Sequence, residues 1–332
     1  MTLLPLIWGF LIAFAVFAYV VLDGFDLGIG ILFPFYQPGK PRDMLMNSVA
    51  PVWDGNETWL VLGGGGLFAA FPLAYAIIMP AVYTPLIIML LSLVFRGAAF
   101  ECRWRSVSRR WFWDLMFNLG SVTAALCQGI ILGALLQGVT INDRAYGGGW
   151  WDWLTGFSLL TGVSVVLGYG LLGATWLVMK MEGELQHKAY ALAWRFGIGT
   201  FAAIGAVSLA TPFLQQDYWR RWFDYPNVLL TAPVPLAVGL VAAALAWTLY
   251  RREESRPFLL VLALFALCFM GLGVSVFPDV VPGRVSIWEA AAPDGSLEFM
   301  LIGAAILLPV ILTYTAYSYW VFRGKVGEHG YH

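Results

Sequence analysis

Four acidic side chains lie within segments of this sequence that are otherwise almost entirely apolar. Asp23 and Asp26 occur in VLDGFDLGIG. Asp54 and Glu57 occur in PVWDGNETW, so both pairs have i,i+3 spacing, which on a helix places the two carboxylates on one face. An ionised carboxylate at the centre of a membrane helix costs about 2.5–3.5 kcal/mol on insertion scales, so such residues usually face the bundle interior and carry function.

Proton transfer is the chemistry that these groups suit. Like charges this close together in a low-dielectric medium cannot all ionise, so we expect some of the four carboxyl groups to be protonated near neutral pH. A group that exchanges a proton near pH 7 can serve in a relay. One structural alternative is that Asp54 and Glu57 cap a helix N-terminus. Another is that Asp23 and Asp26 form fixed ion pairs with a basic residue such as Arg96.

The composition excludes a soluble protein. Hydrophobic residues make up 60% of the 332 residues, against about 45–50% in a soluble domain even with glycine counted. Charged residues make up only 12%, too few for a soluble surface. Because 20 Asp and Glu residues balance 19 Lys and Arg residues, the chain has no positive field for nucleic acid. The sequence therefore predicts an all-α polytopic membrane protein.

Nine apolar runs are long enough to cross a hydrocarbon core of about 30 Å as helices. They cover residues 7–35, 51–72, 74–97, 115–138, 155–179, 197–214, 231–250, 257–277 and 298–322. The N-terminal residues lack a basic region and a small-residue cleavage site, so we interpret the first run as a span and not as a cleaved signal.

The basic residues predict the orientation of these spans. With the N-terminus outside, 15 of the 19 Lys and Arg residues fall in the inner segments 36–50, 96–114, 180–196, 251–256 and 323–332. Basic residues are retained on the cytoplasmic side of membrane proteins. We therefore expect a multi-pass protein of the bacterial inner membrane with the N-terminus outside, the C-terminus in the cytoplasm, and all four carboxylates toward the cytoplasmic side.

The histidines and cysteines indicate that this chain ligates neither haem nor a metal ion. His187, His329 and His332 all lie outside the predicted spans, whereas haem in a membrane bundle normally takes an axial histidine. The three cysteines are scattered and form no CxxC motif. No loop is long enough for a soluble domain, so the chain acts within the membrane or through a partner.

Four motifs in the first hundred residues resemble subunit II of the cytochrome bd-type quinol oxidases, most closely the cyanide-insensitive branch. They are DGFDLGIGILFPF (23–35), NSVAPVWDGNETWL (47–60), LFAAFPLAY (67–75) and FRGAAFE (95–101). The rest of the chain resembles the family in span count, loop pattern and length. The resemblance implies nine transmembrane helices arranged as two four-helix bundles plus one peripheral helix. Residues 1–138 would form the first bundle with the carboxylates, residues 139–277 the second, and residues 278–332 the outer loop, ninth helix and cytoplasmic tail.

The resemblance also implies a function. The family couples quinol oxidation to the reduction of dioxygen to water, which generates proton-motive force. Subunit I carries haems b558, b595 and d (or b) and the quinol site, while a small single-helix accessory subunit and a structural quinone occur in some members. The first acid of DGFD and the acid of WDGN belong to a cytoplasmic proton pathway, which implies that role for Asp23 and Asp54. Glu57, where some members have an amide, and Asp26 are secondary candidates.

Two rival hypotheses use the same residues. In a secondary transporter the four carboxylates would bind a coupling proton or sodium ion at broken helices. In a pure scaffold they would only hold the haem-bearing subunit I in place. A transporter should purify colourless and alone, whereas an oxidase subunit should purify with a haem-rich partner.

Overall fold

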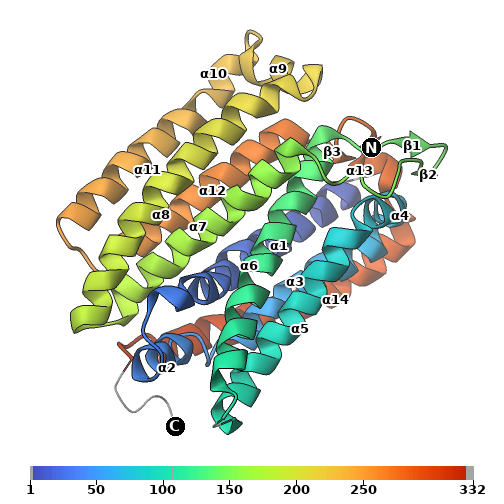
Figure 1. The fold of residues 1–332 in the computed structure, drawn as a ribbon. Helices are drawn as coiled ribbons and strands as arrows, with labels where there is room; N and C mark the ends of the chain where they lie inside the picture. Colours follow the sequence, from blue (N-terminus) through green and yellow to red (C-terminus); the bar gives the residue numbers. More distant parts are fainter. Residues whose placement is uncertain (1–2, 107, 327–332) are drawn as a thin grey trace.

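The computed structural model describes residues 3–106 and 108–326, and long helices that run side by side make up most of it (Figure 1). His329 and His332 lie outside the described residues. Eight of the described helical segments are long and apolar enough to cross a membrane, which confirms an all-α polytopic membrane protein. They are Leu4–Phe35, Tyr83–Arg105, Arg110–Gln137, Gly156–Lys180, Gly183–Phe213, Asn227–Tyr250, Arg256–Val276 and Asp294–Val321.

The chain contains fourteen described α-helices and two short hairpins. In order, the helices are α1 (Leu4–Leu32), α2 (Lys40–Asn47), α3 (Trp53–Ala70), α4 (Pro72–Ala81), α5 (Tyr83–Arg105), α6 (Arg110–Gln137), α7 (Gly156–Lys180), α8 (Gly183–Ala210), α9 (Gln216–Phe223), α10 (Asn227–Thr231), α11 (Pro233–Tyr250), α12 (Arg256–Val276), α13 (Ile287–Ala290) and α14 (Asp294–Val321). Strands β1 (Ile141–Asn142) and β2 (Ala145–Tyr146) pair antiparallel, as do β3 (Asp279–Val281) and β4 (Val285–Ser286). Short 3₁₀ turns, η1 (Phe33–Phe35) and η2 (Thr211–Phe213), follow α1 and α8.

Three spans differ from their predicted bounds. The second predicted span corresponds to α3, which is not among the eight because polar residues at its start lower its mean hydropathy. The third is divided at Val82 into α4 and α5, since Pro85 has no N–H to continue a helical ladder from the preceding turn. The sixth begins at Gly183 and not near residue 197, because the polar residues of α8 lie mostly on its exposed side.

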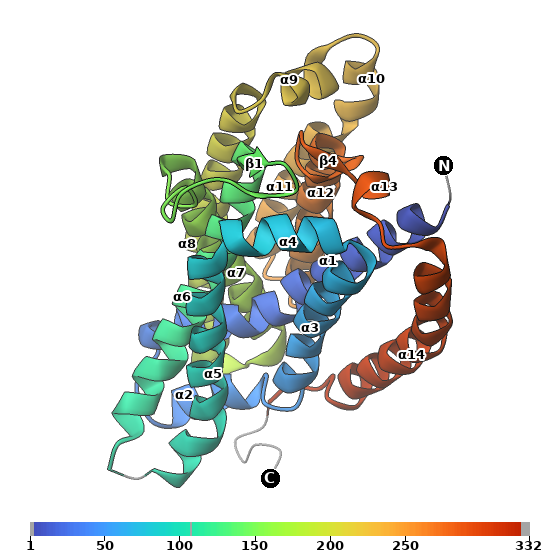
Figure 2. The same ribbon diagram turned by 90° about the vertical axis from the view of Figure 1, so that its right-hand side faces the viewer.

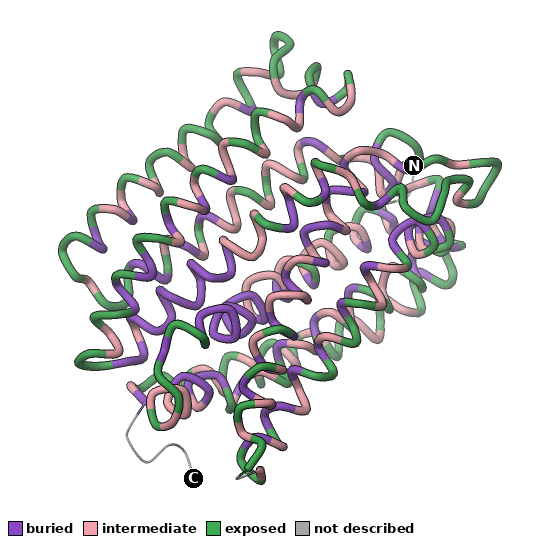
Figure 3. The backbone as a smooth tube through the Cα atoms, in the orientation of Figure 1, coloured by how far each residue is buried: buried purple, intermediate pink, exposed green. Residues whose placement is uncertain are grey.

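Helix α1 forms the centre of the structure. Every residue from Asp23 to Leu32 is buried, and the helix contacts α3, α6 and α7 (Figure 3). Glycines allow this close packing: a Cβ on Gly28 would collide with the backbone of Tyr169 and Gly173 on α7. In the Gly63–Gly66 run of α3, by contrast, only Gly63 and Gly66 face α1, while Gly64 and Gly65 face open space.

Helix α14 lies at the periphery, beside α3 and α1 (Figure 2). The chain after it is held to the end of α7, where Lys180 Nζ donates to the carbonyl oxygens of Phe322 and Gly324 and its own carbonyl accepts from Val326 N at 3.0 Å. Hydrogen bonds from Lys325 and Gln186 lower the pKa of Glu254, in the loop before α12. The described residues after α14 are thus fixed against the end of α7.

We expect Gly28→Leu to prevent correct packing of α1 against α7. Over-packing a core typically costs about 1–3 kcal/mol, and here the obstacle is backbone that cannot rotate away. The yield of monodisperse protein after size-exclusion chromatography, together with the thermal midpoint, measures the effect.

Gly239→Leu on α11 is the matched control, because a Cβ there meets nothing within 4 Å. Equal yields and midpoints for the two variants would contradict the proposed close crossing of α1 and α7.

Candidate functional site

A buried arginine joins two of the four predicted carboxylates. Arg96 of α5 is 0% exposed, and its Nη1 lies 2.6 Å from Oε1 of Glu57 on α3. The same Nη1 lies 3.5 Å from Oδ1 of Asp23 on α1. The ring of Phe100, one turn further along α5, lies 5.6 Å from the guanidinium carbon and covers it. Three helices therefore meet at one ionic cluster, Asp23–Glu57–Arg96.

Asp23 is the most enclosed member of this cluster. Its side chain is 0% exposed, and neither carboxylate oxygen has a hydrogen-bond partner in the described chain. Glu57 is partly exposed, with a side-chain exposure of 24%. One guanidinium faces two carboxylates, so the cluster has a net charge of −1 when both are ionised and becomes neutral when it takes up one proton. Neutralisation is favoured in a medium that solvates charge poorly.

Asp26 belongs to a different interaction. Its Oδ2 accepts a hydrogen bond of 2.6 Å from Nδ2 of Asn56, which also donates to the Leu22 carbonyl at 3.2 Å. The hydroxyl of Tyr319 on α14 donates to Oδ1 of Asn56 at 2.9 Å. Asp26 therefore helps to tie α1, α3 and α14 together, and only Asp23 of this pair contacts Arg96.

Asp54 lies apart from the buried cluster, on the exposed side of the first turn of α3. The residue that precedes this helix is Val52, and it provides no side-chain cap. Helix α3 therefore has no hydrogen-bonded side-chain cap, although Asp54 lies in its first turn, where the positive end of the helix dipole favours a carboxylate. Asp54 lies on the exposed side of α3, and Glu57, almost one turn further on, is partly buried.

A chain of polar side chains continues from Asp23 into the bundle. Tyr19 lies one turn before Asp23 on α1, and its hydroxyl accepts a hydrogen bond of 2.7 Å from Nε2 of Gln128 on α6. Oε1 of Gln128 accepts a bond of 2.6 Å from the hydroxyl of Tyr169 on α7. Sequence reasoning overlooked Gln128, Asn56 and the tyrosines. An amide within an apolar span was a usable signal for Gln128, whereas tyrosine in a span carries no such signal.

Metal-ligating side chains are not clustered in the described residues. Between residues 3 and 326, with residue 107 left out, no three His, Cys, Asp or Glu side chains come close enough to hold a metal ion. His187, the one histidine in the described ranges, is exposed near the start of α8, where its Nδ1 lies 3.0 Å from the Gly183 carbonyl oxygen. An exposed imidazole at a helix end does not fit an axial haem ligand inside a bundle.

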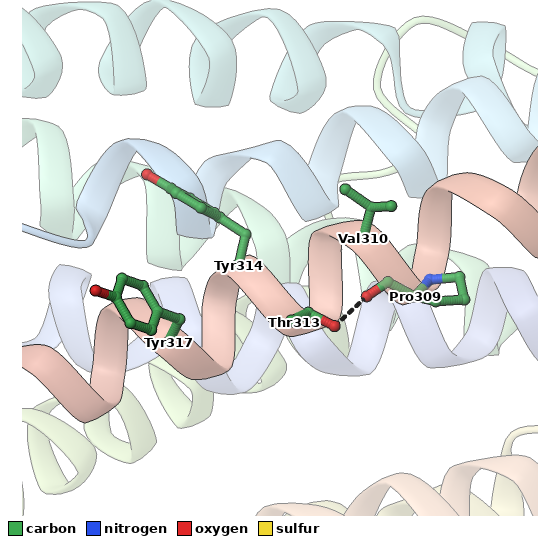
Figure 4. Close-up of a pocket in the computed structure, with 5 residues that line it drawn as sticks. All are labelled: Pro309, Val310, Thr313, Tyr314 and Tyr317. Atoms are coloured by element: carbon green, nitrogen blue, oxygen red, sulfur yellow. Dashed lines mark hydrogen bonds between the residues drawn. The ribbon is translucent and has the colours of Figure 1, made fainter.

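Neither the hollow on α14 nor the pocket at the start of α6 is lined by any of these four carboxylates. A hollow of about 520 Å³ lies on the outer face of α14, where it is lined by Pro309, Val310, Thr313, Tyr314 and Tyr317 (Figure 4). Its only drawn polar contact is the hydrogen bond from Thr313 Oγ1 to the Pro309 carbonyl within the same helix. The chemistry of the buried cluster therefore suits movement of a small species such as a proton better than binding of an organic substrate.

Comparison with known proteins points to one family. The family model described as cytochrome bd terminal oxidase subunit II matches residues 4–322. The chain is 31% identical to cytochrome bd-I ubiquinol oxidase subunit 2 of Escherichia coli strain K12, with 97% of this chain and 95% of that protein covered. It is 30% identical to cytochrome bd ubiquinol oxidase subunit 2 of Bacillus subtilis strain 168, with 97% and 96% covered. Its fold is similar to a chain of the bd oxidase from Geobacillus thermodenitrificans, with a TM-score of 0.74, 18% identity, and 96% and 99% of the two chains covered.

We expect Arg96→Gln to destabilise the protein strongly, because it leaves two carboxylates without their counter-charge. Removing one partner of a buried ion pair costs about 3–5 kcal/mol. Adding Asp23→Asn and Glu57→Gln to this variant should recover part of the lost stability, since the triple variant buries no uncompensated charge. Thermal midpoints of the purified proteins measure both effects.

Arg105→Gln is the control for loss of a charge from α5, because the side chain of Arg105 is 82% exposed and its ion pair with Glu101 lies at the surface. A midpoint for Arg96→Gln that matches that of Arg105→Gln would show that the buried cluster contributes no stability.

Proposed function

Because the chain belongs to the cytochrome bd terminal oxidase subunit II family, we propose that its acidic side chains carry protons from the cytoplasm toward a haem-bearing partner subunit. The chain is a subunit of a membrane quinol oxidase, an oxidoreductase of the respiratory chain in the bacterial inner membrane. The transporter hypothesis has no support from these comparisons. The single observation that carries the proton role is the shared guanidinium of Arg96, which leaves Asp23 and Glu57 with one negative charge in excess.

The proposed route follows increasing burial. Asp54 is exposed, Glu57 is partly exposed, and Asp23 is wholly enclosed. A proton taken up at Asp54 would pass by way of Glu57 to Asp23, each step relieving the excess negative charge beside Arg96. Reduction of oxygen to water consumes protons, so a buried reaction centre requires such a supply. Asp26 holds the helices in position in this scheme and does not relay the proton.

The membrane arrangement is part of the same proposal. Helix α3 would be the ninth span, because its 18 residues cover about 27 Å at 1.5 Å per residue. Residues 1–138 and 139–277 would form two four-helix bundles, and residues 278–332 the outer loop, the peripheral helix α14 and the tail. The N-terminus would lie outside and the C-terminus in the cytoplasm, as the basic residues predict. Asp54 would then face the cytoplasmic side.

The partner completes the enzyme in this proposal. A haem-bearing subunit I would hold haems b558, b595 and d (or b) and would oxidise the quinol. A small single-helix accessory subunit and a structural quinone occur in some members of the family and would join the complex where they are present. The haems supply the oxygen chemistry when bound to that partner. The residues of this chain supply protons and support.

Geometry favours the exposed side of α3 as the surface that meets the partner. Helices associate in a membrane where apolar side chains and small residues are exposed and allow close approach. Exposed residues recur at three- or four-residue intervals on that side, at Asp54, Thr58, Val61, Gly65 and Phe68. Val61 and Phe68 are 73% and 61% exposed. Gly65 has open space where its side chain would be, which permits a second helix to approach closely.

We expect Asp23→Asn and Asp54→Asn to slow quinol-driven oxygen consumption while leaving assembly and haem content unchanged. The amides keep the size of the side chains but cannot exchange a proton at neutral pH. A loss of about 10²–10⁴-fold is typical when a positioned acid–base group is removed. An oxygen electrode, with haem content from the visible spectrum, provides the measurement.

Asp224→Asn is the control, since Asp224 is an exposed acid after α9 and remote from the cluster. If Asp23→Asn and Asp54→Asn both assembled with full haem and full activity, the chain would be a scaffold without a proton role.

A bulky side chain at Gly65 should separate the two subunits. We expect Gly65→Trp to abolish co-purification of the haem-bearing partner, because it fills the space that a partner helix would occupy. Gly239→Trp on α11 is the matched control, as both glycines are free of contacts within 4 Å. Retention of haem by Gly65→Trp at the level of Gly239→Trp would place the interface elsewhere.

A further inference from the structure

A second charged cluster lies at the end of the helix assembly where α1 ends and α6 begins, apart from Asp23 and Arg96. Its centre is Arg103 of α5, which is buried. Arg103 Nε lies 2.5 Å from Oδ1 of Asp114 on α6, and its Nη1 lies 2.8 Å from Oδ1 of Asp43 on α2. The cluster therefore joins α2, α5 and α6 at the end of the bundle.

Two further arginines extend this cluster to the surface. Arg42 donates through Nη1 to Oδ2 of Asp114 at 2.8 Å and through Nε to the Tyr36 carbonyl at 3.0 Å. Arg110 donates through Nη2 to Oδ1 of Asp43 at 2.6 Å. With three guanidinium groups and two carboxylates, the cluster carries a net charge of +1. Both oxygens of Asp114 already accept hydrogen bonds from arginine, so this carboxylate presents little free negative charge.

A pocket of about 350 Å³ opens directly on these arginines. Its lining combines cationic, polar and apolar side chains, and it includes Gly39, the residue that precedes α2. The lining residues are Phe33, Pro34, Pro38, Gly39, Arg42, Arg110, Trp111, Asp114, Leu115 and Asn118. Helix α2 starts beside this pocket and α6 starts within it, and neither is capped by a side chain of its N-cap residue. Uncapped helix N-termini present backbone N–H groups and a positive dipole end, which favour anions.

We propose that this pocket binds the phosphate of an anionic phospholipid. Arg42 and Arg110 line the pocket and supply charged donors for the phosphate, and Nε of Arg110 has no hydrogen-bond partner among the described residues. Basic pockets between membrane helices are established binding sites for anionic headgroups. This inference is independent of the proton route, because it shares no residue with it.

The apolar part of the lining favours a lipid over free phosphate. Trp111 and Leu115 lie one turn apart on α6 and are 68% and 41% exposed. Tryptophan favours the headgroup zone of a bilayer, and the neighbouring leucine can contact an acyl chain. Inorganic phosphate would use the arginines but would gain nothing from these two side chains.

Lipid retention by the purified two-subunit oxidase tests the proposal. The complex is equilibrated with mixed micelles of phosphatidylglycerol and phosphatidylcholine, and native mass spectrometry counts the lipid that stays bound. We expect preferential retention of phosphatidylglycerol, and about tenfold weaker retention in Arg110→Gln, which loses one charge-assisted contact. Asp43 keeps its bond from Arg103 in this variant, so the fold should persist. Arg105→Gln removes an exposed charge from the same end of the bundle and should retain the lipid as before.

Trp111→Ala separates lipid from phosphate and provides a second variant at an exposed position. It should weaken phosphatidylglycerol retention without changing assembly. Equal retention of the two lipids, or equal retention by Arg110→Gln and Arg105→Gln, would overturn the proposal. Displacement of phosphatidylglycerol by an equal concentration of inorganic phosphate, with no effect of Trp111→Ala, would assign the pocket to free phosphate and would also overturn it.

Discussion

A guanidinium buried among apolar helices must be balanced by anions within the same bundle, because the surrounding medium has no water to solvate it. Arg96 of α5 meets this requirement through Glu57 of α3 and Asp23 of α1. Three helices are thereby fixed at one depth relative to one another. Two carboxylates face one arginine, so the cluster that holds the helices together has an excess charge of −1 when both are ionised. Uptake of one proton would neutralise that charge.

The low-dielectric environment of this cluster depends on the packing of α1. Gly28 allows the backbones of α1 and α7 to approach closely, and protein encloses α1 from Asp23 to Leu32. Burial strengthens each electrostatic interaction and makes each unpaired polar atom more costly. The same packing aligns Tyr19 of α1 with Gln128 of α6, so that the polar chain beyond Asp23 is satisfied within the bundle.

The two ionic clusters use the same residue types for different purposes. Around Arg96 the carboxylates outnumber the arginine, and the site is enclosed, which suits uptake of a proton. Around Arg103 the arginines outnumber the carboxylates, and a pocket opens to the surface beside Trp111, which suits an anionic headgroup. Both clusters contain ion pairs, so it is the sign of the excess charge and the access to each site that distinguish the two proposed functions.

The sequence alone determined the membrane class, the family and the acids that deserved study, because the cost of placing a side chain in hydrocarbon acts residue by residue. It could not determine how those acids are grouped. The i,i+3 spacing placed Asp23 and Asp26 on one helix face. The packing of α3 and α5 beside α1 decided their separate partners, so that Asp23 contacts Arg96 and Asp26 accepts a hydrogen bond from Asn56. The same packing left Asp54 exposed and Glu57 partly buried. Helical periodicity fixes the direction in which a side chain points from the axis of its helix. The partner of that side chain depends on which other helix packs against the same face.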